Sequence, residues 1–203
     1  SDAWVAEILA SMPDSGVKAM SLTEMVPTLA EELVEGMQPE EEEASSAEGE
    51  TESEAPEMDE HVWTAPLNAL SMVNAIAAEM SAMDPANTAA YQRNAAAYGE
   101  KLSALDAAFR EVVAGGKRTE LIFGDRFPMR YFTHAYGLTY YAAFPGCSNE
   151  TEPSAQTVAF LMNKVKQDKV PLILYPELST HKVADVISEE TGVPSHVFYA
   201  CHN

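Results

Sequence analysis

Residues 121–146 read LIFGDRFPMRYFTHAYGLTYYAAFPG, and this stretch decides the fold of the chain. The apolar run at 121–123 predicts a strand, and the segment 128–136 predicts a helix that Gly137 ends. A second strand is predicted at 139–144. A strand, a helix and another strand at this spacing indicate a parallel sheet with helices packed on its faces.

The same alternation continues to the end of the chain. Helices are predicted at 154–167 and 181–191, and strands at 172–175 and 196–199. Residues 117–203 therefore read as one α/β unit. The polar side chains that directly follow its strands are Asp125, Arg126, Cys147, Ser148, Glu177, Cys201 and His202. We expect them to meet at one edge, because ligands of parallel sheets bind beyond the carboxyl ends of the strands.

A long helical stretch precedes this unit. Residues 66–114 are rich in Ala, Leu, Met and Glu, and Asp84-Pro85 divides them into two helices. Asp84 is placed to cap the second helix, and Pro85 to occupy its first position. Residues 86–114 then form a helix about 40 Å long. A helix of that length spans a whole domain or connects two.

Three short segments begin the chain. Residues 2–11 predict a helix with Asp2 as its cap, and residues 17–22 predict a short strand. Residues 23–36 form a second amphipathic stretch, which is acidic.

An acidic run separates these segments from the long helices. Eleven of the twenty-one residues at 40–60 are acidic, and residues 19–92 contain neither Lys nor Arg. Such a run cannot bury enough apolar surface to offset its ordering entropy, so residues 38–60 are predicted to be a disordered, solvated loop. The run stops at Glu60-His61-Val62-Trp63. An acidic loop that leads into a histidine suggests cation capture; the alternative is a linker beside a chance histidine.

The net charge limits the classes of partner. The 203 residues include 32 Asp and Glu against 12 Lys and Arg, a net charge of -20. This argues against nucleic acid and anionic membrane surfaces, which both require basic patches. No stretch approaches the roughly 18 consecutive apolar residues that span a bilayer. The two cysteines, Cys147 and Cys201, fit one disulfide, a pair of metal ligands or two unrelated buried thiols.

Several motifs occur in an order that is typical of one family. They are EHVW at 60–63, GDRFPMRYF at 124–132, FPGCS at 144–148, TEPS at 151–154 and CHN at 201–203, together with the long helix after Asp84-Pro85. Nearly the whole chain resembles a bacterial zinc/manganese ABC-transporter substrate-binding protein. The resemblance implies an α/β fold of two lobes with parallel sheets flanked by helices, joined by one long rigid helix, with the metal between the lobes. It implies a partial N-terminal α/β lobe at 1–85 that contains the acidic loop, a linker helix at 86–114 and a C-terminal α/β lobe at 117–203.

The resemblance implies a binding protein rather than an enzyme. Such a protein captures Zn²⁺, or alternatively Mn²⁺, outside the cytoplasm and delivers it to an ABC permease, and its full-length form is a lipid-anchored protein of the cell surface. The chain then reads as a fragment that lacks the anchor, the start of the N-terminal lobe and the C-terminal end, and two copies can associate through an exposed sheet edge. Two other functions stay open. One is the same fold with an adhesin role or a non-metal ligand, and the other is a thiol hydrolase that uses Cys147 or Cys201 with His202.

The resemblance also implies the ligands of the metal. His61 falls at the family's second metal-binding histidine, and imidazole is the commonest zinc ligand. The family's third ligand falls at Arg126, whose guanidinium does not bind metal, so neighbouring Asp125 is the candidate, with a helix N-cap as its alternative role. The family's acidic ligand follows the last strand, where this chain has Cys201 and His202. Imidazole and thiolate both suit zinc.

Three further residues are expected to shape the cleft. Arg126 is expected to order a carboxylate, Glu177 or Glu152, rather than to touch the metal. Glu177 otherwise reads as a helix cap or a solvated carboxylate. Cys147 is expected to lie near Cys201, and we expect a disulfide between them. If both stay reduced, they join a Cys/His zinc site instead.

Overall fold

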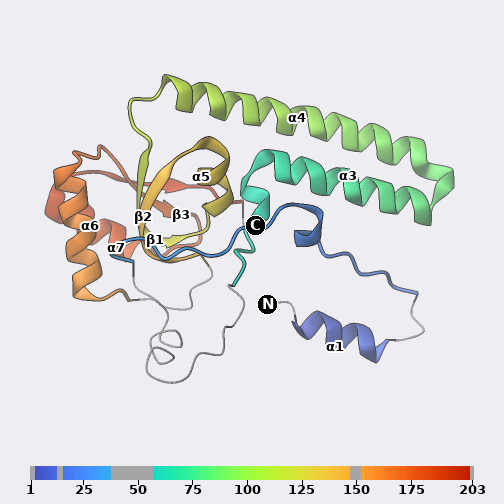
Figure 1. Cartoon of the computed structure of the whole chain (residues 1–203), viewed down its shortest axis with the longest axis horizontal. Coiled ribbons are helices and arrows are strands. Elements are labelled where there is room, and N and C mark those ends of the chain that lie inside the picture. The colour runs from blue at the N-terminus through green and yellow to red at the C-terminus, as the bar shows by residue number, and fades with distance from the viewer. Residues whose placement is uncertain (1–2, 13–15, 38–56, 147–151, 202–203) are drawn as a thin grey trace.

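The sheet forms from the alternating segments of the C-terminal half. The computed structural model describes residues 3–12, 16–37, 57–146 and 152–201. Four strands form one sheet in the order β2-β1-β3-β4 (Figure 1). The strands are β1 Glu120–Phe127, β2 Thr139–Pro145, β3 Ile173–Pro176 and β4 Ser195–Phe198. β1 pairs in parallel with β2 and β3, and β3 pairs in parallel with β4, so the predicted parallel α/β sheet is confirmed.

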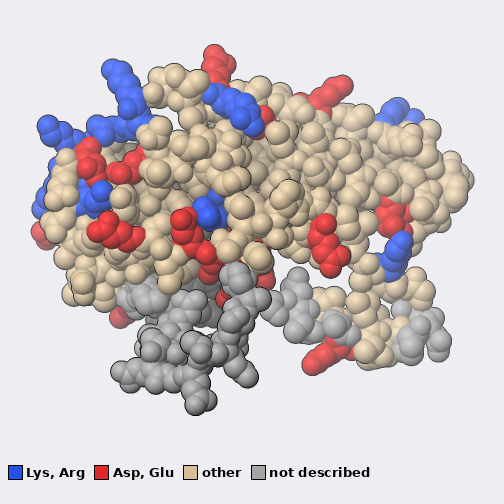
Figure 2. Space-filling model, in the orientation of Figure 1, with Lys and Arg blue, Asp and Glu red and all other residues tan. Residues whose placement is uncertain are grey.

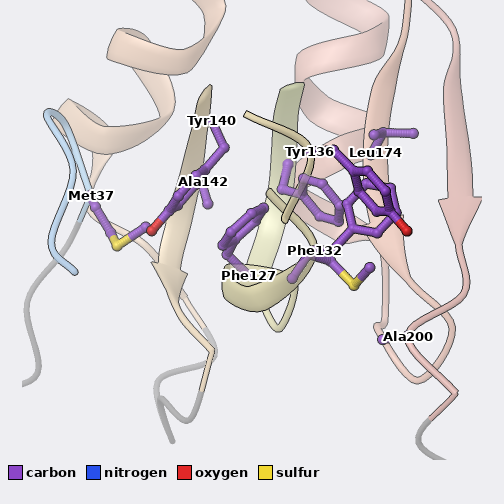
Figure 3. Close-up of a cluster of buried hydrophobic side chains, with 10 residues drawn as sticks. Met37, Phe127, Phe132, Tyr136, Tyr140, Ala142, Leu174 and Ala200 are labelled. Atoms are coloured by element: carbon purple, nitrogen blue, oxygen red, sulfur yellow. The ribbon is translucent and has the colours of Figure 1, made fainter. Parts of the chain in front are cut away.

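Helices cover both faces of this sheet. They are α5 Arg130–Tyr136, α6 Ala155–Gln167 and α7 Lys182–Thr191. Neighbouring strand residues point to opposite faces. Phe123 therefore lies in a buried cluster with Phe132 of α5, whereas Ile122 lies in a cluster with Leu161 of α6 and Ile187 of α7. Figure 3 shows the first cluster, in which aromatic side chains of β1, β2 and α5 pack together.

Local signals fix the ends of these helices. Ser154 caps α6, because its Oγ accepts the backbone N–H of Thr157 at 3.1 Å. Gly137 and Gly192 end α5 and α7 with φ of 65° and 73°, in the left-handed region that glycine adopts without strain. In this half the predicted bounds are confirmed to within one or two residues, except at the end of β1.

Two long helices form an antiparallel hairpin that extends from the sheet (Figure 1). They are α3 Pro66–Met83 and α4 Thr88–Gly115, as predicted. Gly99 lets them approach closely, because a Cβ at this position would lie 2.7 Å from Leu70 Cδ1. A short 3-10 turn, η3 Pro85–Asn87, joins them. Asp84 does not cap the backbone of α4; its carboxylate accepts hydrogen bonds from Asn87 Nδ2 at 2.7 Å and from Tyr91 Oη at 2.9 Å, which hold the turn.

The C-terminal half of α4 fastens the hairpin to the sheet. Buried Asp106 accepts hydrogen bonds from Tyr136 Oη at 3.1 Å and from Arg110 Nε at 2.8 Å. Burial, and the hydrogen bond to Asp106, raise the pKa of the Tyr136 hydroxyl, so it stays protonated and remains a donor. Phe109 packs edge-on against Phe132, with ring centroids 5.0 Å apart. The predicted long helix is thus tied to α5 by both polar and aromatic contacts.

The N-terminal region has less regular structure. Helix α1 Ala3–Ser11 is present as predicted, and its predicted cap Asp2 lies outside the described residues. The prediction of a strand at 17–22 is wrong, because these residues are described and none of them belongs to a strand. A 3-10 turn, η1 Thr23–Met25, follows, and an isolated antiparallel bridge joins Ala30 to Met58. The division at 1–85, 86–114 and 117–203 stays a prediction, and residues 38–56 of the predicted acidic loop lie outside the described residues.

Charged side chains are unevenly spread over the face in Figure 2. Lys and Arg gather over the sheet-bearing end, interspersed with Asp and Glu, whereas the hairpin shows few charges. Among the described helices, none is both long and apolar enough to cross a membrane.

Candidate metal-binding site

His61 begins the short turn that connects the acidic run to α3. The turn is η2 Val62–Thr64, with His61 as its N-cap. The backbone N and Oγ1 of Thr64 both donate to the carbonyl oxygen of His61, at 3.1 and 2.8 Å. His61 is only 7% exposed, although it borders the acidic run. The turn therefore holds the imidazole inside the protein.

Asp59 lies directly beside His61. Its Oδ1 accepts the backbone N–H of His61 at 2.7 Å and lies 3.1 Å from the ring Nδ1. The backbone of Asp59 is fixed to two other segments, because its N–H donates to Leu29 O at 2.9 Å and its carbonyl oxygen accepts from Tyr131 Oη at 2.7 Å. Asp59 is 2% exposed, so the prediction of a solvated loop is wrong for this residue.

The end of β2 packs against the imidazole. A Cβ at Gly146 would lie 3.0 Å from His61 Cε1, 3.2 Å from His61 Nδ1 and 2.9 Å from the carbonyl oxygen of Phe127. A residue without a side chain is therefore required for this approach. The glycine of the FPGCS motif and the histidine of the EHVW motif lie side by side.

The segment after β4 reaches the same place. Trp63 Nε1 donates to the carbonyl oxygen of Ala200 at 2.8 Å, and the ring centroids of Trp63 and His61 are 5.5 Å apart. The backbone N–H of Ala200 donates to Glu177 Oε2 at 2.8 Å, so Glu177 anchors this segment from the end of β3. Cys201 follows directly and is exposed, with a φ of 59°. Groups that follow β2, β3 and β4 thus gather near His61, as the rule for parallel sheets predicts.

Strand β1 continues beyond its predicted end at Phe123. Its register with β2 shifts between Phe123 and Arg126, which marks a bulge that contains Gly124 and Asp125. Gly124 fits against α7, because a Cβ there would lie 2.6 Å from Ala184 Cα. The prediction that Asp125 follows the strand is therefore wrong, because the bulge keeps it within β1.

The partners of Asp125 come from β1 and from the loop after β3. Its Oδ1 accepts the backbone N–H of Arg126 at 2.7 Å and lies 3.7 Å from Arg126 Nη1, and its Oδ2 accepts from Ser179 Oγ. Helix α5 begins at Arg130 with Met129 as its N-cap, so the alternative of Asp125 as a helix N-cap is wrong. The carboxylate instead joins β1 to the loop after β3 and lies beside the Arg126 guanidinium.

Two predicted site residues, Cys147 and His202, lie outside the described residues. The disulfide between Cys147 and Cys201 and the role of His202 therefore stay predictions. Within the described ranges, no group of three or more His, Cys, Asp and Glu residues is arranged to hold a metal ion. The described part of the site brings together His61 and the segment that leads into Cys201, and it engages Asp125 with Arg126 and Ser179.

Sequence reasoning assigned no such role to three residues around His61: Asp59 bonds it, Gly146 packs against it, and Tyr131 bonds Asp59. The signal for Asp59 was local, because an aspartate two residues before a turn residue accepts that residue's backbone N–H. Nothing local marks Tyr131, whose hydroxyl bonds Asp59 across 72 residues of sequence.

Comparisons with known proteins identify related chains. The family model described as ZnuA, zinc-uptake complex component A periplasmic, matches residues 1–202. The zinc-binding lipoprotein AdcA of Streptococcus pneumoniae serotype 4 is 34% identical over 197 residues, which cover 97% of this chain and 37% of the relative. The high-affinity zinc uptake system protein ZnuA of Bacillus subtilis is 33% identical over 140 residues, which cover 69% of this chain and 43% of the relative.

A solved structure has the same fold. The Zn(II)-bound ZnuA-like domain of Streptococcus pneumoniae AdcA superposes with a TM-score of 0.70 and 29% identity, covering 98% of this chain and 65% of that chain. The chain spans less than half the length of the two curated relatives. Because the family model matches almost every residue, and the EHVW and FPGCS motifs meet at one buried histidine, the chain belongs to the ZnuA family of periplasmic zinc-uptake components.

Proposed function

We propose that this chain is part of a binding protein that captures Zn²⁺ outside the cytoplasm and delivers it to an ABC permease. The observation that carries the proposal is the 2.8 Å hydrogen bond from Trp63 Nε1 to Ala200 O, because it joins the segment of His61 to the residue that directly precedes Cys201. The names of the relatives, which describe zinc binding and zinc uptake, support zinc as the cargo.

The proposed ligands are His61, Cys201 and His202, with Asp125 as an oxygen ligand. Neutral imidazole, thiolate and carboxylate are the groups from which tetrahedral zinc sites are built. Asp125 joins the set by exchanging its bond with Ser179 for a bond to the metal. A set with thiolate and imidazole favours zinc over manganese, which prefers oxygen ligands.

Three residues shape the cleft in this proposal. Glu177 holds Ala200 in place from the end of β3. Arg126 has no lone pair to give a metal and contributes a fixed positive charge beside Asp125. Cys147 has one of two roles. It forms a disulfide with Cys201, which would remove the Cys201 thiolate from the ligand set, or it stays reduced and joins Cys201 in a Cys/His zinc site.

The acidic run is proposed to attract Zn²⁺ before the ligands coordinate it. Clustered carboxylates raise the local concentration of cations, but they favour harder ions than zinc. The run therefore collects cations weakly, and final coordination takes place at His61. In the full-length protein, a lipid anchor holds this assembly at the outer surface, where it delivers metal without chemical turnover.

Calorimetric zinc titration of the chain tests the proposal. His61→Ala and His202→Ala are each expected to weaken zinc binding by more than the 10–100-fold typical of losing an outer-shell partner, because each removes a direct ligand. His134→Ala, at an exposed position on α5, is the matched control and should bind zinc like the wild type. Equal zinc affinity in the wild type and the His61/His202 double variant would contradict the proposal.

Two parallel measurements complete the test. Titration with Mn²⁺ is expected to give weaker binding than zinc. Alkylation of thiols with and without zinc separates the two roles of the cysteines. Protection of Cys201 by zinc supports thiolate ligation, whereas two unreactive cysteines in metal-free protein support the disulfide.

A further inference from the structure

We infer that Asp59 is the positioning residue of the metal site, which fixes His61 in the tautomer and orientation that present Nε2 to the metal. The inference rests on the proposed function, because it assigns His61 a metal to bind. It concerns a residue that contributes no ligand of its own. Its basis is the geometry around Asp59, whose Oδ1 is shared between the backbone N–H and the ring Nδ1 of His61.

The shared oxygen selects the tautomer. An ionised carboxylate only accepts hydrogen bonds, so the ring nitrogen 3.1 Å from Asp59 Oδ1 must carry the proton. In a neutral imidazole the proton then sits on Nδ1, and Nε2 keeps the lone pair that a metal requires.

Described residues of the folded domain hold Asp59 in place. Tyr131 Oη donates to the carbonyl oxygen of Asp59 at 2.7 Å and accepts the backbone N–H of Leu29 at 3.0 Å. Leu29 O in turn accepts the backbone N–H of Asp59 at 2.9 Å. Tyr131 is 3% exposed and belongs to α5, which packs on the sheet through Phe132. The position of Asp59 is therefore set by the same unit that holds the segment after β4.

The surroundings of the ring keep this orientation. Gly146 leaves no room for a side chain between the end of β2 and the Cε1–Nδ1 edge of His61. The Trp63 ring lies 5.5 Å from the imidazole at an interplanar angle of 53°. A ring flip would move Nδ1 away from Asp59 and lose its hydrogen bond. The arrangement thus favours one rotamer before any metal arrives.

Nitrogen NMR of the metal-free chain tests this inference directly. Long-range proton–nitrogen spectra of His61 are expected to show the Nδ1–H tautomer as the main neutral form in the wild type. Asp59→Asn keeps the shape but offers a weaker, neutral acceptor, so the Nδ1–H population should fall, and Asp59→Ala should lower it further. Zinc affinity is expected to fall about 10–100-fold in Asp59→Ala and by a smaller factor in Asp59→Asn.

Glu57→Gln is the matched control, because it removes a charge two residues away at an exposed position. It should change neither the tautomer nor the affinity. If Asp59→Ala fails to fold, the graded comparison of Asp59→Asn with the wild type still decides the outcome. A wild type with mainly the Nε2–H tautomer, or an Asp59→Asn variant identical to the wild type in both measurements, would overturn the inference. If His61→Ala leaves zinc affinity unchanged, the proposed function fails instead, whatever the tautomer.

Discussion

The sheet and the segment that carries His61 are held in place by different means. Strand β1 buries side chains on both faces, and both Ile122 and Phe123 are completely buried. Residues 57–65 have a smaller apolar cluster around Val62 and depend on hydrogen bonds that reach from the sheet unit, including those of Tyr131. The difference teaches that the sheet is a stable platform and that contacts to this platform position His61. Stability and metal binding should therefore respond to different substitutions.

The largest expected effect is on the free energy of unfolding, and it tests whether the sheet is the stable platform. Phe123→Ala removes a fully buried ring that packs against Phe127 and Phe198, and it should lower the free energy of unfolding by about 3–5 kcal/mol. Trp4→Ala is the matched control, because Trp4 is 60% exposed on α1 and its loss should cost within about 0.5 kcal/mol. Denaturant unfolding measures both values. Similar costs for the two variants would mean that the sheet is not the stable unit.

The next effect tests the contact between the platform and the histidine. Gly146→Ala places a methyl group 2.9 Å from Phe127 O and 3.0 Å from His61 Cε1, so the ring or the strand end must move. We expect zinc affinity to fall roughly tenfold, the lower end of the range for disturbing the surroundings of a metal ligand. Overpacking should also lower the free energy of unfolding by about 1–3 kcal/mol.

Gly115→Ala provides the control for this variant. A Cβ at Gly115 would meet nothing within 4 Å, so both quantities should match the wild type. Zinc titration and denaturant unfolding of the two variants are compared side by side. Unchanged zinc affinity in Gly146→Ala would show that the imidazole does not depend on the end of β2.

The sequence predicts the platform well because its signals are local. The alternation of apolar runs and helical segments predicts β2, β3, β4 and α5 to α7, and single residues such as Ser154 and Gly192 mark helix ends. It fails at β1, which continues through a bulge that contains Gly124, where α7 approaches closely at Ala184. That approach is a tertiary contact, and no pattern in the sequence of β1 predicts it.

The candidate site is predicted less completely for the same reason. The family motifs point to His61 as a candidate, but the contact that joins its segment to the residue before Cys201 spans 137 residues from Trp63 to Ala200. Asp59 reads as one more carboxylate of a solvated run until its backbone is seen bonded to Tyr131. Composition describes the average environment of a segment, whereas the role of one residue depends on the partner that the fold supplies.

The smallest expected effect lies in the hairpin, away from both regions. Hydrogen bonds from Asn87 and Tyr91 lower the pKa of Asp84 below its ordinary value of 3.8. The unfolded chain then binds more protons than the folded protein near that pH, so the ionised carboxylate stabilises the fold above it, and this contribution is lost as the pH falls through the lowered pKa. Asp84→Asn should therefore reduce the denaturant midpoint slightly between about pH 5 and 7, and the reduction should shrink progressively as the pH falls below 3.8. A reduction that does not change with pH would assign the effect to packing of the turn rather than to charge. Unchanged zinc affinity in this variant would confirm that the hairpin turn does not contribute to the position of His61.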